Sequence, residues 1–151
     1  MLSSGQTILL LNMKHPLRRV LVVDDDTEAA DALAGILQRW FHCQVHAAYD
    51  GADAIEQATQ HRPDAVVLKA DLRGVTGLEV AAVLGRLFRQ SRPKLIAIGA
   101  GPHERHRGQR APRVFDAWLG EPLDLRALMN ELGGERPGRD EPAQVAMRSD
   151  A

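Results

Sequence analysis

Cysteine is nearly absent from this sequence, since Cys43 is the only one among its 151 residues. A single thiol forms no internal disulfide, and it has no further cysteines with which to build a zinc site. Both features are typical of proteins in a reducing compartment. We therefore expect a cytoplasmic protein without structural disulfides or zinc.

A long apolar run is also missing. Residues 8–11 are apolar but too few for a signal-peptide core or a membrane span, and no small-residue cleavage site follows them. Charge of one sign is not in excess either, because 19 Lys and Arg residues balance 20 Asp and Glu residues. The sequence therefore predicts neither a membrane anchor nor a general attraction to nucleic acid.

Short apolar runs alternate along the chain with segments whose apolar residues recur at helical spacing. Apolar residues make up 44% of the chain, which is enough for one globular core. The predicted strands are residues 20–23, 44–48, 65–68, 95–98 and 115–119, and the predicted helices are residues 27–41, 54–61, 78–88 and 125–132. This alternation predicts a doubly wound α/β fold, with helices on both faces of a five-stranded parallel sheet.

We predict one folded domain over residues 19–132, between a tail of residues 1–18 and a polar, disordered tail of residues 133–151. One segment inside the domain departs from the pattern. Residues 103–113 contain four arginines, a glycine and a proline but no apolar face, so we expect the fourth helix to be short or absent. The arginines leave two interpretations open, a solvated loop and a surface for an anionic partner.

The candidate functional residues follow two of the predicted strands. Asp24 and Asp25 come directly after the first strand, and Lys69 comes directly after the apolar run of the third. In open parallel sheets, ligands gather at the carboxyl ends of the strands. Paired carboxylates suit a hard divalent ion, whereas Lys69 brings an ammonium to the same edge of the sheet.

The order of four motifs resembles a response-regulator receiver domain, the CheY-like phosphorelay module of two-component signalling. The motifs are Val22-Val-Asp-Asp25, Ala48-Tyr-Asp-Gly51, Pro63-Asp-Ala-Val-Val-Leu68 leading to Leu72-Arg-Gly-Val-Thr-Gly77, and Pro122 after the fifth strand. The resemblance covers roughly Arg19 to Leu132 and implies a flavodoxin-like fold. In such receivers an acidic pair binds Mg²⁺, an aspartate ending the third strand accepts a phosphoryl group, a Thr or Ser ends the fourth strand, and a Lys precedes the proline.

On this resemblance Asp24 and Asp25 are the acidic pair, but three other positions are changed. The phosphoacceptor position is Lys69, the hydroxyl position is Gly99, and the lysine position is Glu121. An ammonium has no oxygen with which to form an acyl phosphate, and glycine has no hydroxyl. The chain therefore resembles a degenerate, atypical receiver that does not depend on phosphorylation.

Lys69 invites two interpretations, an exposed loop lysine and a built-in cation that replaces Mg²⁺ beside Asp24 and Asp25. We favour the second, so the metal site formed by the two aspartates is expected to be empty and no cofactor is expected, with Mg²⁺ as the alternative. Because the charges at Lys69 and Glu121 are exchanged relative to the family, we also hypothesise that these two residues face each other across the pocket.

Trp118 falls at the position of the family's switch aromatic, and we expect it to be a packed ring because Gly99 supplies no hydroxyl to draw it inward. The predicted function is a signalling module, not an enzyme, that acts through a protein partner of a two-component pathway or as a homodimer, without nucleic acid or membrane. Two alternatives stay open: phosphoryl acceptance by Asp71, and nucleotide binding by the segment Gly99-Ala-Gly101 together with the arginines.

Overall fold

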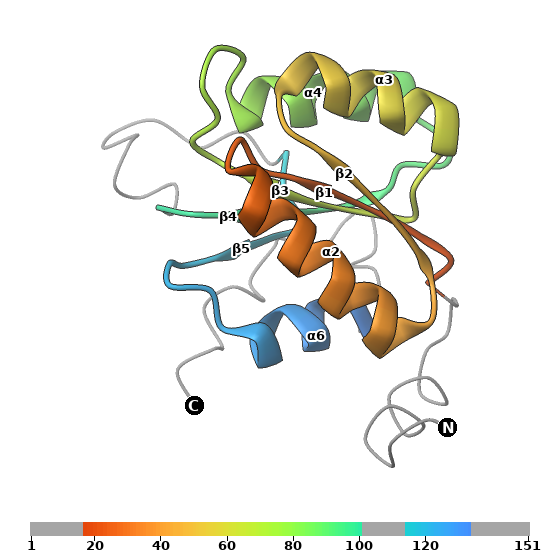
Figure 1. Cartoon of the computed structure of the whole chain (residues 1–151). Helices are drawn as coiled ribbons and strands as arrows, with labels where there is room; N and C mark the ends of the chain where they lie inside the picture. The colour runs from red at the N-terminus through yellow and green to blue at the C-terminus, as the bar shows by residue number, and fades with distance from the viewer. Residues whose placement is uncertain (1–16, 101–113, 134–151) are drawn as a thin grey trace.

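The protein is described by a computed structural model that covers residues 17–100 and 114–133. Five strands form one parallel sheet in the order β2-β1-β3-β4-β5 (Figure 1). The strands are β1 (Arg19–Val23), β2 (Gln44–Ala48), β3 (Ala65–Lys69), β4 (Lys94–Ile98) and β5 (Ala117–Leu119). The helices are α2 (Thr27–Phe41), α3 (Gly51–His61), α4 (Gly77–Leu87) and α6 (Leu125–Gly133).

Helices cover both faces of this sheet (Figure 1). Helices α2 and α6 pack over one core cluster, and α3 and α4 pack over the other. The predicted doubly wound α/β fold with a five-stranded parallel sheet is therefore confirmed. The expected loss of the fourth helix, the whole arginine segment of residues 103–113 and Gly101 all fall on residues 101–113, which lie outside the described residues. The boundaries proposed for the two tails stay predictions.

Strand β3 lies at the centre of the sheet, paired with β1 on one side and β4 on the other. Its residues Ala65 to Leu68 are each no more than 1% exposed, and they alternate between the two core clusters. Such a run of apolar residues suits a parallel strand that is covered on both faces. Burying each Val or Leu side chain of this run contributes about 1.5–3 kcal/mol, and the strand so stabilised places Lys69 at its carboxyl end.

Four strand bounds differ from the sequence prediction: β1 and β4 each begin one residue earlier than predicted, and the end of β3 and the start of β5 also change. Strand β3 includes Lys69, so the interpretation of this residue as a loop lysine is wrong. Strand β5 begins at Ala117, two residues later than predicted. At this point the backbone N–H of Leu95 donates to the Asp116 carboxylate at 2.7 Å in place of a backbone carbonyl, while the Asp116 N–H still donates to the Leu95 carbonyl at 2.7 Å.

The helices begin at the edge of the sheet where the strands end, and side chains cap them there. Asp26 accepts from the third amide of the first helix, and Asp50 does the same for α3. Thr76 and Glu79 form a reciprocal capping box at α4, and Asp124 accepts two amides at the start of α6. Each cap contributes about 1 kcal/mol, and together they fix the loops that carry the candidate site.

Candidate functional site

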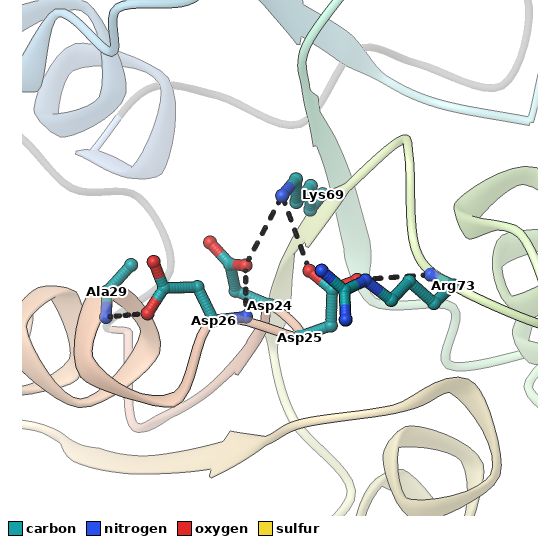
Figure 2. A network of polar contacts seen from close by, with 6 residues as sticks. All are labelled: Asp24, Asp25, Asp26, Ala29, Lys69 and Arg73. Carbon is teal, nitrogen blue, oxygen red and sulfur yellow. Dashed lines mark hydrogen bonds and ion pairs between the residues drawn. The ribbon is translucent and has the colours of Figure 1, made fainter.

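The candidate site lies at the carboxyl ends of β1 and β3, where acidic and basic side chains meet (Figure 2). Asp24 and Asp25 follow Val23, the last residue of β1, which pairs with Leu68 next to Lys69. The backbone N–H of Asp24 donates to Ala48 at the end of β2, at 3.1 Å, and this holds the aspartates against the sheet. The parallel register of neighbouring strands thus explains why residues 44 positions apart are in contact.

The ammonium of Lys69 contacts both carboxylates. Its Nζ lies 3.3 Å from Oδ1 of Asp25 and 3.8 Å from Oδ1 of Asp24 (Figure 2). The Lys69 side chain is 29% exposed, and the side chains of Asp24 and Asp25 are 24% and 17% exposed. The three residues that the sequence grouped at this edge are therefore brought together as one half-buried ion cluster.

Arg73 also belongs to this cluster, and sequence reasoning missed it. Its backbone N–H donates to Oδ2 of Asp25 at 3.1 Å, and its Nε lies 3.8 Å from the same oxygen. The Arg73 side chain is 96% exposed, so the backbone amide makes the better-protected contact. Because the donor is a backbone N–H, the contact does not depend on the residue type, and no pattern in the sequence identifies it.

The pKa values of the cluster favour its charged form. Burial alone would lower the pKa of Lys69, but the hydrogen bond to Asp25 and the charges of Asp24, Asp25 and Glu121 raise it above the ordinary 10.5. Burial alone would raise the pKa of Asp25, but the Arg73 amide and the Lys69 ammonium together hold it below the ordinary 3.8. At neutral pH the Lys69 ammonium and the Asp25 carboxylate are therefore both charged.

The arrangement does not fit a divalent ion. Oδ1 of Asp25 accepts from Lys69, its Oδ2 accepts from the Arg73 amide, and Oδ1 of Asp24 accepts from the amide of Asp26 at 2.9 Å. A Mg²⁺ ion needs oxygen ligands at about 2.0–2.1 Å, and here it would lie next to an ammonium that repels it. Within residues 17–100 and 114–133, no group of three or more His, Cys, Asp or Glu side chains is arranged to hold a metal.

Gly99 adopts a backbone conformation that few other residues tolerate. Its φ angle is 135°, in the region that L side chains rarely adopt. Space is not the obstacle, because a Cβ built at Gly99 would lie 3.5 Å from the Cβ of Ala70, an ordinary contact. A Thr or Ser at this position would therefore require the backbone after β4 to change.

Trp118 lies in β5, and Glu121 lies in the turn that follows this strand. Glu121 is exposed, and its charge contributes to the raised pKa of Lys69. Among the ion pairs of the described residues, however, none joins Lys69 directly to Glu121, so Asp25 and Asp24 are the contact partners of the ammonium. Trp118 is half-buried and packs edge-to-face against Phe115, with 4.9 Å between the ring centroids.

A parallel sheet in the order β2-β1-β3-β4-β5, with paired carboxylates after β1 and the site at the end of β3, defines the class of CheY-like receiver folds. The family model of the response regulator receiver domain matches residues 20–117, and the chain therefore belongs to that family. It is a receiver domain of two-component signalling, as its motifs predicted.

Relatives and solved structures agree with this assignment. The transcriptional regulatory protein PrrA of Mycobacterium tuberculosis is 42% identical over 66 residues, which cover 44% of this chain and 28% of PrrA. A CheY-like receiver domain from Methylobacillus flagellatus is 27% identical with a TM-score of 0.64, over 74% of this chain and 92% of that one. The receiver domain of Saccharomyces cerevisiae Ssk1, solved with the histidine phosphotransfer protein Ypd1, is 18% identical with a TM-score of 0.66, over 85% and 97% of the two chains.

The match to PrrA covers less than a third of that relative's length, so the relative has extensive sequence with no counterpart in the match. The M. flagellatus domain, in contrast, is matched over nearly its whole length.

Each helix in the described part of the chain is too short or too polar to cross a bilayer.

Proposed function

We propose that this receiver domain signals without accepting a phosphoryl group and acts by protein–protein interaction. The observation that carries the proposal is the Lys69 ammonium, which lies at the end of β3 and 3.3 Å and 3.8 Å from the carboxylates of Asp25 and Asp24. In this proposal the ammonium takes the place of both the phosphoryl acceptor and the divalent ion, and the domain is not an enzyme.

The chemistry of an ammonium supports this proposal. A lysine attacks phosphorus only through the lone pair of its neutral amine, and the raised pKa keeps Lys69 protonated at neutral pH. Gly99 supplies no hydroxyl for a phosphoryl group, and its φ of 135° disfavours a replacement that would. We infer that the domain rests in one state and that Trp118 remains packed against Phe115.

A protein partner from a two-component pathway is the interaction that we propose. The receiver domain of Ssk1 was solved with a histidine phosphotransfer protein, and a receiver without phosphoryl chemistry retains only its surface with which to signal. We propose the cytoplasm as its compartment, in keeping with the single Cys43. A homodimer is the alternative assembly.

The proposal is tested by incubating the purified full chain with a small-molecule phosphodonor and Mg²⁺ and measuring its intact mass. We expect no covalent phosphate, while a receiver with an aspartate acceptor, treated in parallel, gains one. A stoichiometric, base-labile adduct that maps to Asp71 or to either aspartate of the pair would contradict the proposal. An adduct on Asp71 would favour the alternative in which that residue is the acceptor.

A further inference from the structure

A second polar region lies at the opposite edge of the sheet, where β1 and β2 begin and α2 ends. An open hollow of about 640 Å³ is present there, a volume in the range of small-molecule sites. Its polar lining consists of Arg18, Arg19, Gln38, His42, Cys43 and Gln44. None of these residues belongs to the Lys69 cluster, so the hollow is independent of the function proposed above.

The backbone on one side of the hollow is held in place by hydrogen bonds. The N–H groups of Arg18 and Arg19 donate to Oδ2 of Asp64 at 2.8 Å and 2.9 Å, and the N–H of Gln44 donates to the carbonyl of Arg18 at 2.9 Å. The two arginine residues are nevertheless exposed. Their guanidinium groups therefore extend from a fixed backbone and remain accessible to a ligand.

The charge of the lining is positive. Arg18 and Arg19 each carry a guanidinium, and no lining residue carries a carboxylate. Burial raises the pKa of the Cys43 thiol to about 11, so this side chain is uncharged at neutral pH. The nearby carboxylate is Asp64, whose Oδ2 is already shared by two amides. Arg39 in the last turn of α2 offsets the negative end of the helix dipole.

The donors that line the hollow match a specific ligand chemistry. A guanidinium presents paired N–H groups that bind carboxylate or phosphate oxygens in a bidentate manner, and the Gln38 and Gln44 amides add further donors. His42 ends α2 in the left-handed conformation, with its own N–H bonded to Gln38, and its imidazole is the remaining polar group. We propose that the hollow binds a small anion with two or more phosphate or carboxylate groups.

The test is an NMR titration of the isotope-labelled full chain with pyrophosphate and, separately, with citrate, at constant ionic strength and with sodium chloride as the control. We expect saturable shifts of the amides of residues 17–19 and 42–44 with at least one of the two anions. Shifts with pyrophosphate alone assign a phosphate ligand, shifts with citrate alone assign a carboxylate ligand, and shifts with both assign a general polyanion site.

The variant Arg18→Gln/Arg19→Gln should bind the active anion about tenfold more weakly, since it loses both exposed charge contacts. The variant Arg86→Gln/Arg89→Gln has the same charge change near the end of α4, on the other face of the sheet, and should bind like the unmodified chain. The single variants Arg18→Gln and Arg19→Gln replace the double variant if it fails to fold. Shifts that do not saturate, that chloride reproduces or that both double variants weaken equally would overturn the proposal.

Discussion

Replacing Lys69 with Met is expected to destabilise the domain by about 1–3 kcal/mol at pH 7, between the values for exposed and for buried ion pairs. Met has a similar length but no charge, so the carboxylates of Asp24 and Asp25 are left facing each other without the ammonium that now lies 3.8 Å and 3.3 Å from them. The free energy of unfolding from urea denaturation measures this loss.

The pH dependence of the loss follows from the pKa values. The folded-state pKa of Asp25 is lowered, so its ion pair stabilises the fold above the ordinary value of 3.8, and this contribution is lost as pH falls through the folded-state pKa. The folded-state pKa of Lys69 is raised, so its contribution is present below 10.5 and is lost only as pH rises through the higher folded-state value. The penalty of Lys69→Met should therefore be constant near neutrality and shrink below about pH 4.

The matched control for this variant is Arg73→Gln, because the Arg73 side chain is 96% exposed and its main contact with Asp25 is made by the backbone. We expect this variant to lose less than about 0.5 kcal/mol. Equal losses for Lys69→Met and Arg73→Gln would show that the Lys69 ammonium stabilises the fold no more than an exposed arginine does.

The variant Lys69→Asp is expected to gain a response to Mg²⁺ that the unmodified chain lacks. It places a third carboxylate beside Asp24 and Asp25 and removes the ammonium that repels a divalent ion, so the site acquires the oxygen ligands that Mg²⁺ prefers. Without metal, three like charges should make the variant less stable than the unmodified chain. Mg²⁺ at ten times its dissociation constant should then restore about 1.4 kcal/mol of unfolding free energy.

Urea denaturation of Lys69→Asp with and without Mg²⁺ measures this gain, and a sodium salt at matched ionic strength is the control. Lys69→Asn is the matched variant, because it removes the ammonium without adding a carboxylate and should respond much less to Mg²⁺. An unmodified chain that Mg²⁺ stabilises as strongly as Lys69→Asp would show that the ammonium does not exclude the metal.

The sequence predicted the sheet and its central strand because these depend on local patterns. The apolar run Ala65 to Leu68 is short, and Pro63 before it and Gly74 after it limit its length. The helical spacing of apolar residues over residues 27–41 predicted the bounds of α2. The start of β5 was predicted wrongly, because the Asp116 carboxylate there accepts the Leu95 N–H in place of a backbone carbonyl. No local pattern in the sequence reveals which backbone amide a side chain will bind.

The site was predictable to the extent that topology determines it. Asp24, Asp25 and Lys69 were grouped correctly at one edge because parallel strands end together. The contribution of Arg73 was not predictable, since it is made by a backbone N–H. The exchanged charges suggested a direct pair of Lys69 with Glu121, but the loop after β5 leaves Glu121 exposed, and only its charge acts on the ammonium.

The most direct test of the internal cation is a double-mutant cycle of Lys69→Met and Asp25→Asn, with the unfolding free energies measured at pH 7. The contact of 3.3 Å predicts a coupling energy of at least about 1 kcal/mol, whereas the cycle of Lys69→Met with Glu121→Gln should be additive within about 0.5 kcal/mol. If Lys69→Met and Asp25→Asn are also additive within that limit, the ammonium does not stabilise the carboxylates, and Lys69 is not the fixed cation of this receiver.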